Sequence, residues 1–246
     1  MKIFIDPGHG GKDPGAVGNG LREKDLALDI SIIQKALFEK LGHEVKISRA
    51  TDVFVDLYER VREANAWGAD LFISNHVNSG GGQGVEVWHS IYGGKGKEYA
   101  YKVEKELSKL INSRGLKTKR GKNGDYLYVI RSTRMPAILN EFGFIDNASD
   151  AIKLKDNTFR QQLAEAVVKG IARQTVCSTN SINGRYGIVT ASALNVRGGA
   201  GTNYPIIGKL KNNERVKLCK DCGNGWYEIY FGDHGGFVSK EYVRLI

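Results

Sequence analysis

Four residues that lie far apart along the chain are of types that bind metal ions or transfer protons: His9, Glu23, His76 and Glu141. His9 lies in the glycine-rich run 6–11, directly after a short apolar stretch that is typical of a β-strand. Glycine lets such a loop turn sharply and lets a bound group come close to the backbone. A turn with an incidental histidine would explain this loop equally well on its own, so the interpretation depends on the other three residues.

His76 and Glu141 also follow predicted strands. The apolar run 71–74 leads into His76, and the run 137–140 leads into Glu141. Short apolar runs of this kind are typical of buried strands. Glu23 opens a predicted helix, where a carboxylate also interacts favourably with the helix dipole, so an ordinary first-turn acid is the alternative for this residue.

The predicted elements alternate between strand and helix. Apolar residues at three- and four-residue steps predict helices over 24–41, 56–67, 96–113 and 157–174, and short β-rich runs predict strands over 45–48, 71–74, 85–88, 127–130 and 137–141. This alternation predicts an α/β fold with a mostly parallel twisted sheet flanked by helices. Because ligands bind beyond the carboxyl ends of strands in such sheets, we expect His9, His76 and Glu141 to meet at one edge.

Two imidazoles and a carboxylate are a known ligand set for zinc, and they leave a fourth position open for water. Zinc lowers the pKa of a bound water from 15.7 to about 7, which makes hydroxide available near neutral pH. A further carboxylate that does not bind the metal can take the proton of that water and pass it to a leaving amine. Glu141 fits this role. The other histidines have no comparable setting.

The net charge of +9 favours anionic partners such as nucleic acid or anionic cell-wall polymers. Residues 1–175 carry +5 of it, and the last 71 residues carry +4. The densest basic run contains Lys117, Lys119, Arg120 and Lys122; a solvated loop is its ordinary explanation.

The cysteines and the apolar stretches limit the class of protein. Only three cysteines occur, Cys177, Cys219 and Cys222, which argues against a disulfide framework and fits a reducing compartment. Cys219 and Cys222 have metal-like spacing, but no second cysteine pair completes a zinc site. No apolar stretch approaches the roughly 20 residues that cross a bilayer, and no secretory signal precedes the first strand. The sequence therefore predicts synthesis in the cytoplasm, without stable membrane insertion.

The chemistry-bearing residues stand in motifs that resemble one enzyme family, the zinc-dependent N-acetylmuramoyl-L-alanine amidases. The resemblance covers about residues 1–175 and rests on these segments: Asp6-Pro7-Gly8-His9-Gly10-Gly11, Asp13-Pro14-Gly15-Ala16, Glu23, Ser48-Arg49-Ala50-Thr51-Asp52, Arg60, Ala64-Asn65, Ala69-Asp70-Leu71, Ser74-Asn75-His76-Val77-Asn78, and Glu141-Phe142-Gly143-Phe144-Ile145-Asp146-Asn147.

The resemblance implies that His9, Glu23 and His76 bind Zn²⁺ and that Glu141 is the catalytic acid and base. It implies hydrolysis of the amide that joins the lactyl group of N-acetylmuramic acid to L-alanine in peptidoglycan. Asn75 and Val77 depart from the family pattern, which usually has an aliphatic residue and an alanine there. Because they flank His76, these departures bear on substrate preference in this interpretation rather than on metal binding.

The sequence changes character after residue 175. Residues 176–184 are polar and lack periodicity, which predicts a linker. Residues 185–246 predict six short strands, over 187–189, 193–197, 206–210, 215–218, 226–229 and 236–238, and so a small all-β barrel. This part resembles the bacterial SH3-like domains of cell-wall enzymes, through Leu194-Asn195-Val196-Arg197-Gly198-Gly199, Gly225-Trp226-Tyr227 and Gly235-Gly236-Phe237-Val238. The resemblance implies that residues 185–246 anchor the enzyme to the wall.

Two other classes of function remain open at this point. A zinc peptidase or deacetylase would use the same ligand set, because metal chemistry specifies the reaction type better than the substrate. A non-catalytic wall-binding protein is the other, although the presence of all four site residues argues against it. We expect peptidoglycan as the partner, no nucleic acid, and an undetermined oligomeric state. The combination of modules fits a phage endolysin that acts on the wall after release, with a bacterial autolysin or mother-cell lytic amidase as the alternative.

Overall fold

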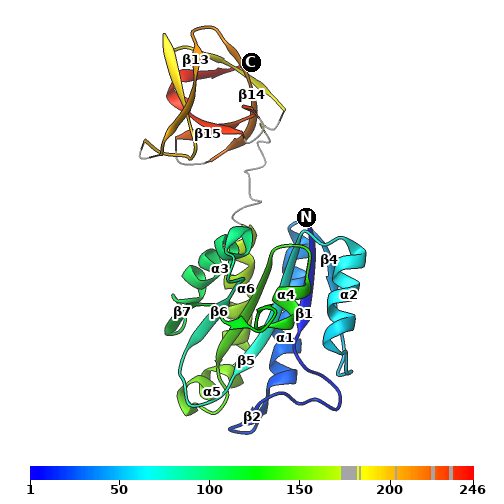
Figure 1. Ribbon diagram of the computed structural model, residues 1–246. Helices are drawn as coiled ribbons and strands as arrows, with labels where there is room; N and C mark the ends of the chain where they lie inside the picture. The colour runs from blue at the N-terminus through cyan, green and yellow to red at the C-terminus, as the bar shows by residue number, and fades with distance from the viewer. Residues whose placement is uncertain (173–181, 183, 203, 223–224, 233–234) are drawn as a thin grey trace. The chain divides into compact units, whose positions relative to one another are not determined.

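The computed structural model describes residues 1–172, 182, 184–202, 204–222, 225–232 and 235–246 (Figure 1). The chain separates into two compact units, Met1–Arg173 and Gln174–Ile246. Most of the predicted linker 176–184, including Cys177, lies outside the described residues. Among the helices that the structure describes, none is both long and apolar enough to cross a membrane.

The first unit is built on a six-stranded sheet. Its strand order is β4 (Glu44–Ile47), β1 (Lys2–Pro7), β5 (Leu71–Asn78), β10 (Ala137–Phe144), β6 (Val85–Trp88) and β7 (Ser113–Lys117). Every neighbouring pair is parallel except β10 and β6, which are antiparallel. The predicted mostly parallel sheet is therefore confirmed.

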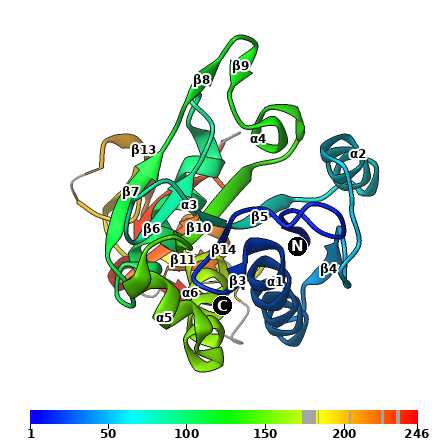
Figure 2. The same ribbon diagram turned by 90° about the horizontal axis from the view of Figure 1, so that it is seen from below.

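Helices cover both faces of this sheet (Figure 2). One face packs against α1 (Glu23–Lys40), α3 (Gly94–Leu107) and α6 (Asn157–Ala172), and the short α5 (Ala148–Lys155) packs on α6 and β10. The other face packs against α2 (Leu57–Trp67) and α4 (Tyr128–Ser132). Alternate residues of each strand supply the two cores: Ile3, Ile5 and Ile73 face α1, whereas Phe4 and Phe72 face α2.

Two predicted elements of this unit are wrong. Residues 127–130 were expected to form a strand, but they begin helix α4, because four apolar residues are too few to distinguish the two periods. The predicted helix over 96–113 ends as α3 at Leu107. The chain then turns, and the Val85 N–H donates to the carbonyl of Asn112 (2.8 Å). Ser113, the last residue of the predicted helix, begins strand β7 and pairs with Val85 of β6.

Short elements complete this unit. Two-stranded ribbons are formed by β2 (Val17–Gly18) with β3 (Leu21–Arg22) and by β8 (Arg120–Gly121) with β9 (Gly124–Asp125). Helix α2 begins after Asp56, whose side chain accepts a hydrogen bond from the Glu59 N–H (2.9 Å), and it ends at Gly68 with φ +68°. These caps explain why the predicted helix over 56–67 is found almost unchanged.

The second unit is a seven-stranded antiparallel sheet with its own apolar core. Its strands are β11 (Tyr186–Val189), β12 (Ala193–Arg197), β13 (Ile206–Lys211), β14 (Arg215–Asp221), β15 (Trp226–Ile229), β16 (Gly236–Ser239) and β17 (Val243–Leu245), with a short helix η1 (Lys240–Tyr242) before the last. The six predicted strands are present, and β17, which pairs with β11, was missed. The predicted small all-β unit is confirmed.

Candidate metal centre and catalytic site

His9 lies in a constrained loop directly after β1. Its backbone has φ +60°, a left-handed conformation that costs energy for a residue with a side chain. Two buried arginines bind the carbonyls of this loop. Arg60 donates to the carbonyls of Pro7 (2.6 Å) and His9 (2.7 Å), and Arg49 donates to that of Gly8 (2.7 Å). The loop is therefore held by hydrogen bonds from charged donors, which are stronger than neutral ones.

The charge of Arg60 is balanced inside the protein. Arg60 and Asp6 are 2% and 1% exposed, and Arg60 Nη1 lies 2.6 Å from Asp6 Oδ1. Burial opposes ionisation of Asp6, but the Arg60 guanidinium and the Ser48 and Ser74 hydroxyls hold its pKa below the usual value. The loop that carries His9 thus depends on a buried ion pair.

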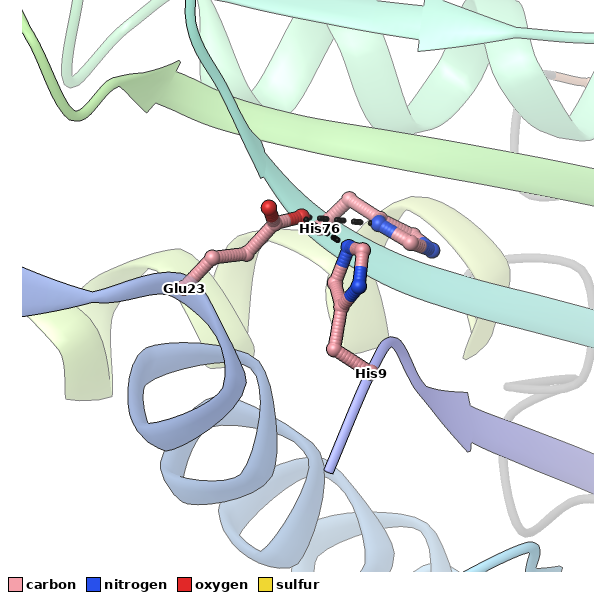
Figure 3. A group of neighbouring side chains, drawn as sticks. All are labelled: His9, Glu23 and His76. Atoms are coloured by element: carbon pink, nitrogen blue, oxygen red, sulfur yellow. Dashed lines mark hydrogen bonds and ion pairs between the residues drawn. The ribbon is translucent and has the colours of Figure 1, made fainter. Parts of the chain in front are cut away.

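Glu23 is the first residue of α1 and points back toward the sheet (Figure 3). Its Oε2 accepts a hydrogen bond from the Ala16 N–H (2.8 Å), and its Oε1 accepts one from the Val77 N–H (3.1 Å). Although burial opposes it, the His76 and His9 rings hold the pKa of Glu23 far below its usual value. Glu23 is therefore a carboxylate at any physiological pH.

The structure brings His9, Glu23 and His76 together from three separate elements (Figure 3). Glu23 Oε1 lies 3.1 Å from His9 Nε2 and 2.8 Å from His76 Nδ1. One ligand atom from each residue lies within 4.8 Å of the other two, and this is the one such group among the described residues. Within the described residues, Cys219 and Cys222 belong to no such group, so their metal-like spacing is not matched by a candidate site.

Small residues make room for these three side chains. A Cβ atom at Gly8 would lie 2.3 Å from the His76 ring. A Cβ atom at Gly15, whose φ is +65°, would lie 2.6 Å from Glu23 Oε2 and 2.7 Å from the His9 ring. The other nitrogen of His9, Nδ1, lies 2.8 Å from Asp13 Oδ2. A carboxylate on the distal nitrogen of a histidine is the usual outer partner of a metal ligand, so this donor set fits zinc.

Glu141 lies on the strand next to His76. The two residues are in register on the parallel strands β10 and β5, so their side chains project from the same face of the sheet. The register of β10 shifts between Glu141 and Phe144, a bulge at which Gly143 has φ +128°. The Oε2 atom of Glu141 is buried and has no hydrogen-bond partner among the described residues.

The environment of Glu141 favours its protonated form. Burial is the main cause, and the carboxylates of Glu23 and Glu86 add to it, so that the pKa of Glu141 is well above its ordinary value. Glu86 lies directly opposite Glu141 on the antiparallel strand β6. Arg114 binds Glu86 at 2.7 Å from its other side. An acid with a raised pKa can both hold and release a proton near neutral pH.

A cavity of about 640 Å³ adjoins this centre. It reaches His9 and His76, and most of its lining is apolar. One part of the lining is formed by Phe54, which precedes α2, and by Leu57 and Tyr58 in the first turn of α2; Tyr128 of α4 forms another part. Such a mostly apolar cavity beside a few polar groups is typical of a substrate site.

The two departures from the family pattern face away from this cavity. Asn75 is fully buried, and its side chain donates to Ser31 Oγ (2.8 Å) and Gln34 Oε1 (2.8 Å) of α1. Val77 is 1% exposed and packs in the core on the same face. The structure therefore assigns both residues to packing under α1, and their expected link to substrate preference stays a prediction.

Several residues of the site were not recognised from the sequence. Arg49 and Arg60 appeared only as members of motifs, and Glu86, Phe54 and Tyr128 not at all. Glu86 stands in the alternating run Val85 to Trp88, where a polar residue ordinarily faces solvent, yet it is only 5% exposed. A charged residue inside a short apolar strand was the available indication.

Comparison with known proteins agrees with this geometry. Residues 3–173 match the family described as N-acetylmuramoyl-L-alanine amidase, and residues 192–244 match the bacterial SH3 domain. The chain is 39% identical over 224 residues to the sporulation-specific N-acetylmuramoyl-L-alanine amidase of Bacillus subtilis (strain 168), which covers 90% of this chain and 86% of that protein.

A phage protein and a solved structure are also similar. The endolysin of Bacillus phage SPP1 is 40% identical over 176 residues, 69% of this chain and 64% of the endolysin. The structure of the amidase AmiC2 of Nostoc punctiforme superposes with a TM-score of 0.65 at 34% identity, over 71% of this chain and 97% of the solved chain. The chain belongs to the N-acetylmuramoyl-L-alanine amidase family of enzymes, and a bacterial SH3 domain follows its amidase part.

Proposed function

We propose that this chain hydrolyses the amide between the lactyl group of N-acetylmuramic acid and L-alanine in peptidoglycan, with zinc held by His9, Glu23 and His76. The observation that carries the proposal is the buried Oε2 of Glu141, which has no hydrogen-bond partner among the described residues and lies on the strand next to His76. A buried polar atom without a hydrogen bond is costly, so its retention points to a role in the reaction.

When bound, zinc supplies Lewis-acid polarisation of the carbonyl and lowers the pKa of a water. The remaining work falls to this chain's own residues. Glu141 takes a proton from the attacking water and delivers it to the amine of the departing L-alanine. Its raised pKa favours uptake of the proton by the Glu141 carboxylate, and the carboxylic acid formed in that step is the donor to the amine. Asp13 and the loop carbonyls bound by Arg49 and Arg60 keep His9 in position.

The apolar cavity gives the substrate an orientation. Tyr58, which is 61% exposed, offers a ring face beside His9 and His76, and Phe54, over whose ring Lys12 Nζ lies, adds apolar surface. A sugar ring has apolar C–H faces, and aromatic side chains bind such faces well. We propose that the muramic acid residue lies against this wall, with its lactyl carbonyl directed toward the ligands.

Chemical analysis of the products tests this proposal. Purified peptidoglycan digested by the full chain is expected to gain amino termini on alanine without gaining reducing sugar ends. New amino termini on other residues would indicate a peptidase, and release of acetate a deacetylase. Binding to walls without any new group, in protein that contains zinc, would support the non-catalytic alternative.

The second unit is proposed to hold the enzyme on the wall. A cavity of about 510 Å³ in this unit is lined by Arg197, Trp226 and Tyr242, with other residues of β12 and η1. Tyr227 is buried in the core, whereas Tyr204 and Tyr230 are 45% and 53% exposed. The exposed rings and this cavity offer contacts to a wall peptide or polymer. An anchor on an insoluble substrate raises the effective concentration of the enzyme.

Two biological roles remain candidates. Similarity to the sporulation-specific amidase extends over 90% of this chain and so includes the second unit, which favours lysis of a bacterial mother cell. Similarity to the phage SPP1 endolysin supports host lysis by a phage. The time of synthesis separates the two roles. Transcription during sporulation supports the first, and transcription after prophage induction supports the second.

A further inference from the structure

The positive charge of the chain is concentrated in one segment. Residues 113–136 contain seven Lys or Arg and one Asp, which gives +6 of the total +9. The rest of residues 1–175 contains 20 basic and 21 acidic residues, a net charge of −1. The charge of the enzyme unit is therefore a local feature and not a general property of its surface.

Most of these cations have no acidic partner. Glu86 pairs with Arg114 and also lies 3.9 Å from Lys117. The one acid of the segment, Asp125, uses its carboxylate to accept hydrogen bonds from the Ser90 hydroxyl and the Ile91 N–H (both 2.7 Å). Within the described residues no ion pair is formed by the remaining five: Lys119, Arg120, Lys122, Arg131 and Arg134.

Aromatic rings hold three of the cations in place. Lys119 Nζ lies 4.0 Å from the centre of the Tyr126 ring. The guanidinium of Arg120 lies 6.0 Å from the Tyr92 ring, and that of Arg131 lies 5.3 Å from the Tyr128 ring. Such contacts are attractive and reduce the freedom of long side chains. The cations are thus ordered before any ligand arrives.

The same segment lines a cavity of about 470 Å³. Arg131 and Arg134 contribute to it from α4 and the residues that follow, and Lys95 contributes from the first turn of α3. The Ser90 and Thr133 hydroxyls also line the cavity, but they donate their protons to Asp125 Oδ2 and to the Val129 carbonyl. Helix α3 begins there without a side-chain cap, so its first N–H groups are available to an anion.

This cavity lies at the start of β10, between the first turn of α3 and helix α4. The ribbon β8–β9 and helix α4 project from the same side as α2 (Figure 2). The cavity reaches Ala137, which shares a face of β10 with Glu141 and precedes it by four residues, or about 13 Å along the strand. A polymer bound here would lie beside the reaction centre without occupying it.

We propose that this basic cluster, defined as Lys95, Lys119, Arg120, Arg131 and Arg134, binds the phosphodiester groups of an anionic polyol-phosphate polymer of the cell wall. Arginine and lysine side chains, together with helix N–H donors, are groups that bind phosphate. Nucleic acid is disfavoured because Tyr92, Tyr126 and Tyr128 already carry cations on their rings, whereas single-stranded binders leave rings free to stack on bases. The choice of a wall polymer rests on the proposed function.

The test compares two triple variants of the full chain. Lys95→Gln, Arg120→Gln and Arg134→Gln together remove three charges from the cluster. Lys40→Gln, Lys153→Gln and Lys155→Gln remove three charges from α1 and α5, as the matched control. Binding to immobilised poly(glycerol phosphate) is expected to weaken about 100-fold in the cluster variant at low salt, and far less in the control. Binding by the unchanged chain is expected to fall steeply with salt.

Three results would overturn the proposal: equal losses in both variants, binding to walls that does not change when their phosphodiester polymers are removed, or tighter binding to DNA of similar charge. Hydrolysis of a soluble muropeptide is measured in parallel. Because that reaction needs no polymer, an inactive enzyme that still binds poly(glycerol phosphate) would contradict the proposed function while supporting the cluster.

Discussion

Glu86 and Glu141 lie directly opposite each other on the antiparallel strands β6 and β10. Residues opposite each other on such strands project from the same face, so two carboxyl groups share the edge of the site. Arg114 binds Glu86 and stabilises its charge. The negative charge of Glu86 then helps burial to keep a proton on Glu141. This pairing tunes the residue that we propose to transfer the proton.

The pairing predicts a shift in the pH profile. Glu86→Gln removes one negative charge beside Glu141 and lowers its pKa, although burial still keeps that pKa raised. If the ionised form of Glu141 starts the reaction, the acid limb of kcat/KM moves to lower pH. Glu98→Gln, at an exposed position of helix α3, is the control and leaves the limb in place. An acid limb that does not move in Glu86→Gln would show that Glu86 does not influence the proton transfer.

Substitutions at the four site residues should divide into two groups. Glu141→Gln is expected to retain zinc and to lose about 10²–10⁴-fold in kcat, the usual effect of removing a general acid and base. His76→Ala is expected to lose zinc itself, because a ligand is gone. Metal analysis and turnover of a soluble muropeptide are measured on the same samples. A Glu141→Gln enzyme that kept the original rate would exclude Glu141 as the proton carrier.

Zinc retention should depend on pH through His9. Burial lowers the pKa of His9, but Glu23 and Asp13 outweigh it and raise that pKa above the ordinary value of 6.5. Zinc requires the neutral ring, so its apparent affinity falls as the pH drops through this raised pKa.

Asp13→Asn tests the same link in a second way. Loss of the carboxylate lowers the pKa of His9, which moves the midpoint of zinc loss to lower pH. It also removes the group that orients the ring, so affinity at high pH drops about 10–100-fold. Asp25→Asn is the control, because Asp25 lies at the same helix end as Glu23 but pairs with Arg22 and not with His9. A midpoint that stays in place would show that His9 does not govern the competition with protons.

The buried pair of Asp6 and Arg60 should be essential for stability. Arg60→Met leaves the Asp6 carboxylate buried without its partner, which typically costs about 3–5 kcal/mol in the free energy of unfolding. Urea denaturation measures the change. The control is Arg62→Met on the same helix, which breaks only the exposed pair with Glu59 and should change stability little.

The same pair predicts acid sensitivity. The pKa of Asp6 is lower in the folded chain than its ordinary value of 3.8. Ionised Asp6 therefore contributes its full share of the free energy of unfolding above pH 3.8. This share is lost as the pH falls through the lower pKa of the folded chain. The Arg60→Met variant, which has no such pair, should lose less stability over this interval. Parallel losses in both proteins would contradict this assignment.

The sequence predicts the site residues better than it predicts the loops and buried hydrogen bonds that position them. His9 and His76 were recognised because they follow short apolar strands, and parallel strands bring their ends to one edge. Arg60 lies in a helix whose polar residues look solvated, and only the fold shows that its guanidinium reaches back to the Pro7 and His9 carbonyls. Contacts between residues more than 50 positions apart leave no local pattern to detect.

The wrong predictions have a related cause. Residues 127–130 and the end of α3 are short apolar stretches in which local preference is weak, and tertiary packing decides. Val129 and Ile130 are buried in the core that α2 and α4 share, which the helical form allows. Similarly, the +9 charge was recognised, but its concentration beside α4 depends on Lys95 and Arg134 meeting in one cavity.

The two units should divide the work between chemistry and attachment. Their apolar cores share no residue, so a chain that ends at residue 175 is expected to fold without the second unit. We expect this shortened chain to cleave soluble muropeptides at the rate of the full chain, and to be much weaker on intact walls, where attachment raises the local concentration.

Trp226→Ala in the full chain is the companion variant, because it alters the proposed wall-binding cavity while both units remain. It should reproduce the defect on intact walls and keep full activity on muropeptides. Equal lysis of intact walls by all three proteins would remove the anchoring role from the second unit and leave attachment to the basic cluster of the first.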